Sequence, residues 1–495
     1  MSRFGNTLGH TFIYMAGLML NRGVAFLLVP LFTRVFAPAD FSVWDLCNTT
    51  LLLLFPMLDF GMSPAVLRFY HEYPDGRDKV AAFNTSLFFV AGLHAVLVVA
   101  GLVAAPWLSM AVFGSADRAG LVRIVVLLAS ATALGKQGLS LLRTMERSMA
   151  YAGLNVVRGI IGPAVIVALV MGLKMGVAGA LWGDLVGLVF LAAATLWVCR
   201  AWLHPVFRMD ILRDMLRFAL PLVPVGVSVA VLMIADRPFL SHLVALKDMA
   251  PYSLGFRVGM LMALFTQSLQ LSWPPSAMTM AAKPGGGAAD IARTGYLLQV
   301  VLFACATAIS CCTPELLRVF APRTGYDGAA FILPWIAYSY AINGAVQVVS
   351  AGIGISKRTI WSMWTTLVSC ALKLAVTYWF ILHFGIIGAA ASTFLAFAFQ
   401  LALTYLVTQR IVYPLPHDTK RILALYGASG ACMLLVLGAC ALPGLLSLGA
   451  RAAILAAFAL IGWFGLLGAA DRNSTLSMAG GLLLRVGLGR AATAG

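Results

Sequence analysis

Long runs of apolar residues, separated by short polar breaks, recur along almost the entire chain. A hydrocarbon core about 30 Å thick needs about 20 apolar residues of helix to cross it, and the chain holds about fourteen such runs. Inside lipid each run must satisfy its own backbone hydrogen bonds, which a helix does. The composition agrees, because 61% of the residues are hydrophobic and only 11% are charged, against about 25% charged in an ordinary soluble domain. We therefore predict an all-α polytopic membrane protein with about 14 transmembrane helices.

The boundaries of these runs follow from the polar breaks between them, with an uncertainty of a few residues at each end. The predicted spans cover residues 9–32, 42–64, 80–104, 120–142, 152–172, 177–199, 217–238, 251–275, 293–313, 328–350, 360–382, 386–409, 422–440 and 451–470.

The formal net charge of +16 could indicate a nucleic-acid partner, but the basic residues are scattered as ones and twos between apolar runs. This distribution marks membrane topology instead of a nucleic-acid groove. If the N-terminus is inside, most of the Lys and Arg residues fall on the cytoplasmic side, as the positive-inside rule requires. We predict a multi-pass protein of the cell inner (cytoplasmic) membrane with both termini in the cytoplasm, and no nucleic-acid partner.

The loops between the spans are too short to hold an extracellular catalytic domain. The most glycine-rich loop, "KPGGGAAD" at 283–290, lacks the Lys-Ser/Thr pair with which an ATPase loop holds phosphate and magnesium. The eight cysteines lie in or beside apolar runs, and the histidines show no ligand spacing, so neither a disulfide framework nor a metal site is indicated. We expect no cofactor, no metal and no enzymatic activity.

The chain also shows a weak internal repeat. Span two opens with "FSVWDL" at 41–46 and span eight opens with "YSLGFR" at 252–257, and each follows a helix that ends in a proline-containing polar turn. A parallel repeat of six helices fits this offset, and many transporters handle their substrate at such a repeat interface. We predict an N-terminal six-helix lobe at 1–208 and a C-terminal six-helix lobe at 209–415 around a central cleft, followed at 416–495 by two additional helices and a short cytoplasmic tail.

The first helices of the two repeats contain prolines, namely Pro30 in span one and Pro221 and Pro224 in span seven. Proline removes a helix hydrogen bond and kinks the helix, so both are predicted to bend. Bending of this kind suits alternating access, although static kinks fixed by packing are equally common.

Ionisable side chains inside spans are the most informative residues, because each costs several kcal/mol unless it is paired or hydrated. The six bases are Arg22, Lys136, Arg158, Arg237, Arg257 and Lys373, and the four acids are Asp45, Asp59, Asp184 and Asp236. The excess of bases suits an interior that receives an anion.

Each of these residues also has a structural interpretation. Asp59 would suit a helix cap, Asp236 and Arg237 could be interface residues that close span seven, and the lysines could pair with neighbouring helices. Arg158 could extend to the interface along its own stem. If the repeat holds, Asp45 and Arg257 face one another and could form an outer gate.

Several segments together resemble a known family. These are "NRGVAFLLVPLFTRVFAPADFSVWDL", "LDFGMSPAVLRFYHEY", "LLRTMERSMAY", "FALPLVPVGVSVAVLMIADRPFLSHLVALKDMAPYSLGFRVGML" and "FGIIGAAASTFLAF". They occur in the family's order within about residues 5–410 and resemble the Wzx-type oligosaccharide-lipid flippases of polysaccharide biosynthesis. These flippases belong to the multidrug/oligosaccharidyl-lipid/polysaccharide exporter superfamily. One departure from the family pattern is Phe41-Ser42, where a Phe-Gly phrase is usual.

The resemblance implies two six-helix lobes and a polyprenyl-pyrophosphate-linked oligosaccharide repeat that moves from the inner to the outer leaflet, for exopolysaccharide or O-antigen biosynthesis. We expect membrane lipids, the polymerase and other polysaccharide-assembly proteins as further partners, and we expect the protein to be a monomer. In such proteins cleft cations meet the pyrophosphate, and Arg22, Arg237 and Arg257 lie in matching motifs. We assign pyrophosphate binding to Arg22, Arg257, Lys136, Arg158 and Lys373, and gating or ion coupling to Asp45, Asp59, Asp184, Asp236 and Arg237.

Two alternatives stay open. An ion-coupled exporter of another amphipathic substrate would share the architecture, but a cation exporter should have a cleft rich in acids. A membrane glycosyltransferase or polymerase should carry a substantial outward catalytic loop.

Overall fold

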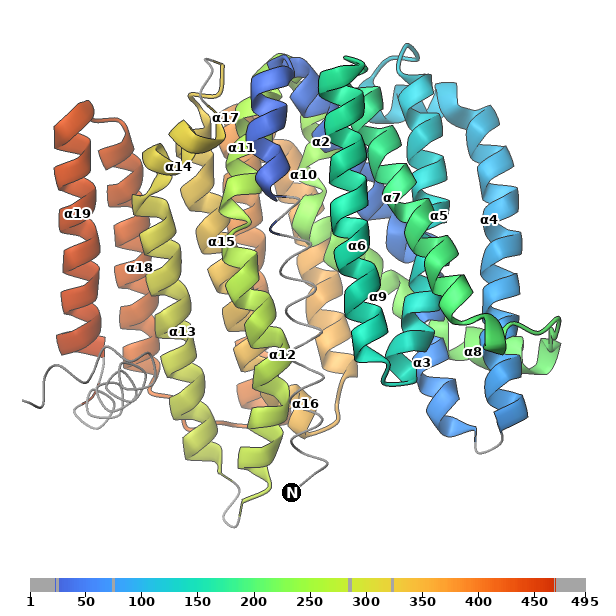
Figure 1. Ribbon diagram of the computed structural model, residues 1–495. Coiled ribbons are helices and arrows are strands. Elements are labelled where there is room, and N and C mark those ends of the chain that lie inside the picture. The colour runs from blue at the N-terminus through green and yellow to red at the C-terminus, as the bar shows by residue number, and fades with distance from the viewer. Residues whose placement is uncertain are drawn as a thin grey trace, which may run out of the picture. The chain divides into compact units, whose positions relative to one another are not determined.

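The computed structural model describes residues 23, 26–73, 76–283, 287–321, 325–466 and 468, and the regular structure within these ranges is entirely helical (Figure 1). Ten of these helices are long and apolar enough to cross a membrane, and a bent pair adds an eleventh candidate. The protein is therefore a multi-pass helical membrane protein. This agrees with the predicted fold class, and within the described residues helices lie along each predicted span from the second to the fourteenth, with span seven divided among three helices.

The described chain forms two compact units by its internal contacts. The first comprises 1–258, 317–332 and 363–400, and the second comprises 259–316, 333–362 and 401–495. This division follows packing and differs from the lobe boundaries proposed from the sequence at 208 and 415, which stay a prediction.

The first unit begins with helical residues Phe26–Val35 and continues through α2 to α10 into α11. Their bounds are α2 Pro38–Leu58, α3 Met62–Glu72, α4 Gly76–Phe113, α5 Ala119–Thr144, α6 Ser148–Val167, η1 Ala168–Gly172, α7 Gly176–Val198, η2 Arg200–Trp202, α8 Met209–Ala219, α9 Leu222–Ile234, α10 Asp236–Leu243 and α11 Leu246–Gly259.

The second unit is built from α12, α13, α16, η3, α18, α19 and η4, with parts of α14, α15 and α17. The bounds are α12 Met262–Ala281, α13 Ala288–Cys311, α14 Thr313–Phe320, α15 Ala329–Val349, α16 Ala351–Ile355, α17 Ile360–Val407, η3 Thr408–Val412, α18 Thr419–Cys440, α19 Gly444–Leu460 and η4 Ile461–Leu466.

Glycines allow close packing between α6 and α7 of the first unit. A Cβ built on Gly183 would lie 2.6 Å from the backbone nitrogen of Ile166, and one on Gly187 would lie 3.0 Å from the Cα of Gly162. In lipid there is little hydrophobic drive between helices, so close backbone approach through small residues supplies the van der Waals contact. The glycine-rich sequences of these two spans therefore specify that they pack together.

Several predicted spans are broken or bent. Span two breaks after α2, where Phe60 and Gly61 have φ of 49° and 67°. Helices α8 and α9 meet at an angle of 41°, beside Pro221, so the predicted bend in span seven is confirmed. Spans eleven and twelve form a single helix, α17, which is interrupted at Gly385 with φ 55° and ψ −134°.

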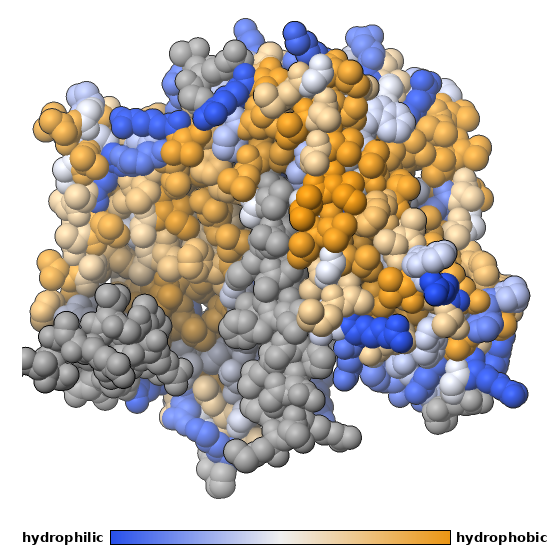
Figure 2. All heavy atoms as spheres, in the orientation of Figure 1, coloured by the Kyte–Doolittle hydropathy of each residue, from blue (hydrophilic) through white to orange (hydrophobic). Residues whose placement is uncertain are grey.

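The surface has the polarity that a membrane requires. Large apolar side chains of α6 such as Val157 and Ile160 are 40% and 60% exposed, and Figure 2 shows hydrophobic side chains along this helix. Hydrophilic side chains gather at helix ends, including those around α8 (Figure 2). Exposed apolar surface of this extent suits contact with lipid tails.

Candidate functional site

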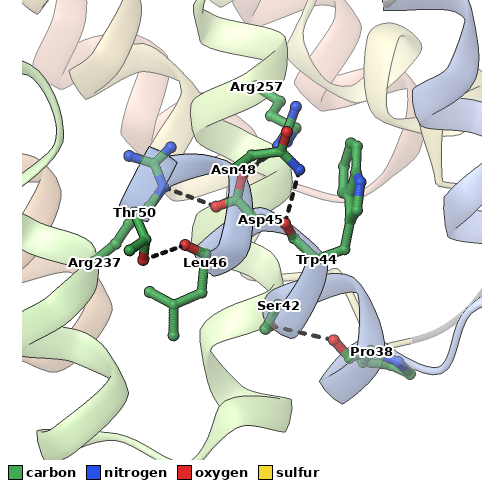
Figure 3. Close-up of polar contacts among 9 residues, drawn as sticks. All are labelled: Pro38, Ser42, Trp44, Asp45, Leu46, Asn48, Thr50, Arg237 and Arg257. Atoms are coloured by element: carbon green, nitrogen blue, oxygen red, sulfur yellow. Dashed lines mark hydrogen bonds and ion pairs between the residues drawn. The ribbon is translucent and has the colours of Figure 1, made fainter. Parts of the chain in front are cut away.

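One carboxylate in the first unit joins two arginines from different helices (Figure 3). Asp45 on α2 accepts a hydrogen bond from Arg237 Nε through Oδ2 at 2.7 Å. It accepts a second from Arg257 Nε on α11 through Oδ1 at 2.8 Å. The side chains of Asp45 and Arg237 are 2% and 3% exposed, whereas that of Arg257 is 22% exposed. Arg257 is thus the member of this group that an outside molecule can reach.

Aromatic rings hold both guanidinium groups in place. Arg237 lies over the ring of Phe256 at 3.9 Å, and Arg257 lies over the ring of Trp44 at the same distance. Stacking of this kind attracts a cation to the negative face of the ring. It also orients the planar fork with which arginine binds phosphate oxygens.

A second buried ion pair lies beside the first group. Lys373 Nζ on α17 is 3.4 Å from Asp236 Oδ1, and both side chains are 0% exposed. The same ammonium donates to Thr393 Oγ1 at 2.5 Å and to Ser392 Oγ at 3.3 Å. The lysine therefore has two hydroxyl groups as hydrogen-bond acceptors and one carboxylate at ion-pair distance.

The two ion pairs are connected because Asp236 and Arg237 are consecutive residues at the start of α10. Consecutive side chains on a helix point about 100° apart, so Asp236 reaches Lys373 on α17 while Arg237 reaches Asp45 on α2. Instead of pairing with each other at the end of span seven, the two residues open a new helix and connect it to two others. We call Asp45, Asp236, Arg237, Arg257 and Lys373 the charge cluster.

The structure places the other predicted site residues elsewhere. Arg158 on α6 pairs with Asp184 on α7 at 3.3 Å, with side chains 26% and 33% exposed. Lys136 Nζ lies 3.6 Å from the centroid of the Phe55 ring. Asp59, between α2 and α3, accepts a hydrogen bond from Ser63 Oγ at 2.7 Å and a longer one from the Ser63 backbone N–H at 3.4 Å.

Arg22 lies outside the described residues. The charge cluster thus gathers five of the predicted site residues, and four others lie outside it. The assignment of substrate contacts to individual residues stays a prediction.

Sequence reasoning missed a buried arginine in the second unit. Arg451 on α19 is 4% exposed and binds both oxygens of Glu315 on α14, at 2.5 and 2.9 Å. Its signal in the sequence was a lone base at the first residue of the last predicted span. The hydroxyls of Ser392 and Thr393 were also missed, since Ser and Thr are common in membrane helices and give no signal alone.

An apolar cavity of about 500 Å³ lies within the first unit, between α2, α4 and α5. Its lining includes Cys47 and Pro238, which follow Asp45 and Arg237 closely in the chain. The cavity therefore lies next to the residues that carry the charge cluster. Within the described ranges no group of three His, Cys, Asp or Glu side chains could hold a metal ion.

These features define a class of protein, a multi-helix membrane protein with a buried cluster of cations in one unit. Solved structures share its fold. One described as "Lipid II flippase MurJ, inward closed conformation" has a TM-score of 0.73 at 13% identity, over 91% of this chain and 99% of that one. An inward-facing MATE-family multidrug resistance transporter has a TM-score of 0.57 at 15% identity, over 84% of this chain and 99% of that one.

The family follows from the sequence. Residues 8–275 match the family described as "Polysaccharide biosynthesis protein", so the chain belongs to that family. No curated protein matches the chain in sequence. The resemblance to polysaccharide biosynthesis flippases is thereby confirmed at the level of family and fold.

Proposed function

We propose that the protein is a flippase that moves a polyprenyl-pyrophosphate-linked oligosaccharide repeat unit from the inner to the outer leaflet of the cell inner membrane by alternating access. The observation that carries the proposal is the charge cluster, in which three cations share two carboxylates. Family membership and the flippase fold support the same function.

The chemistry of the substrate matches the cluster. A pyrophosphate linkage carries about two negative charges, and its attraction to fixed cations is far stronger where the effective dielectric is low. The partly exposed Arg257 can turn its fork from Asp45 to phosphate oxygens, since charge-assisted bidentate bonds to either partner are similar in kind. When no substrate is bound, the Asp45 carboxylate occupies the place of the phosphate and holds both arginines in position.

The apolar part of the substrate also has a matching surface. A polyprenyl chain needs contact with apolar side chains, and the cavity in the first unit supplies them near the cluster. A substrate with an anionic head and a long apolar chain would thus find both features in one unit. An exporter of apolar cations would not use an excess of positive charge at this position.

The test is deletion of the gene followed by analysis of lipid-linked intermediates. Loss of a flippase leaves finished lipid-linked repeats on the inner leaflet, loss of a transferase leaves shortened ones, and loss of an unrelated exporter leaves the intermediates unchanged. Complementation with Arg257→Ala is expected to leave finished repeats accumulating. Arg213→Ala, an exposed arginine on α8, is the matched control and is expected to restore export. Full export with Arg257→Ala would remove the site from the proposal.

A further inference from the structure

The charge cluster contains more cations than its carboxylates balance. Arg237, Arg257 and Lys373 supply three positive charges, while Asp45 and Asp236 supply two negative ones. With all five side chains ionised the cluster carries one net positive charge. Four of the five side chains are at most 3% exposed, so water screens this charge poorly.

The carboxylates are distributed unequally among the cations. Both oxygens of Asp45 are taken by arginines, so Asp236 is the only carboxylate of the cluster left for Lys373. Within the described part of the chain, neither oxygen of Asp236 accepts a hydrogen bond of good geometry, and the distance to Lys373 Nζ is 3.4 Å. The compensation of the lysine is therefore looser than that of the arginines.

The surroundings of Lys373 can hold its amine in either protonation state. The groups around it are Asp236 with the adjacent Arg237 from α10, and the hydroxyls of Ser392, Thr393 and Thr377 on α17. Asp45 on α2 and Arg257 on α11 lie beyond Arg237. A hydroxyl accepts from an ammonium and can rotate to donate to a neutral amine, so the site stays hydrogen-bonded when a proton leaves.

The three cations differ in their chemistry. Arginine stays protonated in proteins, whereas a buried lysine can lose its proton. Lys373 is therefore the cation of the cluster through which one positive charge can be released. An anion at Arg257 balances the same charge from outside.

We propose that Lys373 is a proton-exchanging residue that couples anion binding at Arg257 to proton uptake. This proposal rests on the proposed function and extends it to the coupling of transport. When the pyrophosphate group binds, the neutral amine takes a proton from water and becomes an ammonium. When the pyrophosphate leaves, the ammonium returns that proton to water. Binding energies are reciprocal, so protonation of Lys373 strengthens anion binding by the same factor by which the anion favours protonation.

The test measures proton uptake on binding of farnesyl pyrophosphate to the full-length protein in nanodiscs. Calorimetric titration at pH 8.5 in two buffers of different ionisation enthalpy gives the number of protons taken up. This pH lies well above the range near 6 in which a phosphate ester takes its second proton. The wild type is expected to take up as much as one proton per ligand, with a Kd that rises by up to tenfold per pH unit in the range where Lys373 titrates.

Two variants separate the contribution of Lys373 from other sources of protons. Lys373→Arg keeps the positive charge but cannot release it, so it is expected to bind without proton uptake and with a flat pH profile. Lys247→Arg changes an exposed lysine of α11 and is expected to behave like the wild type. Lys373→Met replaces the lysine by a neutral side chain and serves as a second variant if the arginine variant fails to fold. It is expected to bind farnesyl pyrophosphate more weakly than the wild type and without proton uptake.

The outcomes distinguish the two proposals. Absence of binding in the wild type counts against pyrophosphate recognition and hence against the proposed function. Binding without proton uptake in the wild type, or uptake that persists in both Lys373 variants, overturns the coupling proposal alone.

Discussion

At the scale of single residues, the arrangement of partners explains how a membrane protein holds five charges in one place. Asp45 accepts a hydrogen bond from each of two arginines, and each arginine also lies over an aromatic ring. Taking a charge out of water costs several kcal/mol, and only good geometry with further hydrogen bonds recovers it. The cluster therefore depends on every member being present, which makes single substitutions informative.

The first prediction concerns the carboxylate that joins the arginines. Asp45→Asn keeps the shape but removes the charge, so Arg237 is left in a buried site without its anion. Breaking a buried pair in this way costs about 3–5 kcal/mol, and we expect that loss in unfolding free energy of the purified protein in detergent.

The control for this prediction is Glu72→Gln, which breaks the exposed pair with Arg68 at the end of α3. An exposed pair contributes about 0–1 kcal/mol, so the control should unfold nearly like the wild type. Equal effects of the two substitutions would contradict the role given to Asp45.

The second prediction concerns His417 in the connection between η3 and α18, outside the spans. Burial lowers the pKa of this imidazole below its ordinary value, so the folded protein resists protonation at a pH where the unfolded chain accepts a proton. The resulting stabilisation is present above the ordinary pKa and is lost as the pH falls through the lowered one.

Thermal unfolding between pH 7.5 and pH 5 tests this sign. The wild type should lose stability on acidification, and His417→Gln should lose less because it has no imidazole to protonate. His71→Gln removes an exposed histidine on α3 and should follow the wild type. An identical acid sensitivity of His417→Gln and the wild type would refute the assignment.

At the scale of elements, the breaks in the helices position the site. Helix α9 ends at Ile234 and α10 begins at Asp236, so two consecutive charges start a new helix and reach two different neighbours. The interruption of α17 at Gly385 separates the stretch that carries Lys373 from the one that carries Thr393, and the chain returns so that the two meet.

The third prediction follows from this interruption. Gly385 has φ of 55° and ψ of −134°, a backbone conformation that side chains with a Cβ adopt at a cost of about 1–3 kcal/mol. A Cβ there would meet no atom within 4 Å, so the cost of Gly385→Ala is backbone strain alone. We expect unfolding free energy to fall by that amount.

Gly427→Ala is the matched control. Gly427 is an exposed residue of α18 whose Cβ would also meet nothing, and it has ordinary helical geometry. Replacing a helical glycine by alanine stabilises by about 0.5–1 kcal/mol. The two substitutions should therefore change stability in opposite directions, and a stabilising Gly385→Ala would show that the turn does not need glycine.

The sequence predicted the elements better than their breaks. Hydropathy locates a span because every residue of the run contributes to it, which is why α5, α7 and α18 lie close to their predicted ranges. The break after α2 depends on the positive φ of Phe60 and Gly61, a local backbone conformation that hydropathy does not record.

Partners across helices were harder still to predict. The proximity of Asp45 and Arg257 was foreseen only through the internal repeat. Nothing in the sequence relates Asp236 to Lys373, because that contact depends on the depth and rotation of α10 against α17. Arg451 and Glu315 show the same limit in the second unit.

At the scale of the whole molecule, the proposed function requires a defined orientation in the membrane. Under that function the substrate enters from the cytoplasmic leaflet, and the positive-inside rule predicts that the loop at 145–147 lies inside and the loop at 114–118 lies outside. Both connections have described backbone and join α4, α5 and α6 by short turns, so a small thiol reagent can reach them.

The fourth prediction uses this difference between the two loops. Cys312 is exposed and is first replaced by serine so that it gives no background. In that protein, Ser115→Cys is expected to react with a membrane-impermeant maleimide added to intact cells. Glu146→Cys is expected to react only after the cells are opened, because its loop is predicted to face the cytoplasm.

The labelling pattern bears on function as well as on topology. A flippase that exports lipid-linked sugar must present Arg257 to a substrate made on the cytoplasmic side. If the molecule were inverted in the membrane, Ser115→Cys would be protected in intact cells and Glu146→Cys would be labelled. Labelling of both in intact cells would show that membrane integrity had failed, which a cytoplasmic marker protein measured in parallel detects. Labelling of Glu146→Cys alone would reverse the orientation, and with it the direction of transport that the proposed function assigns.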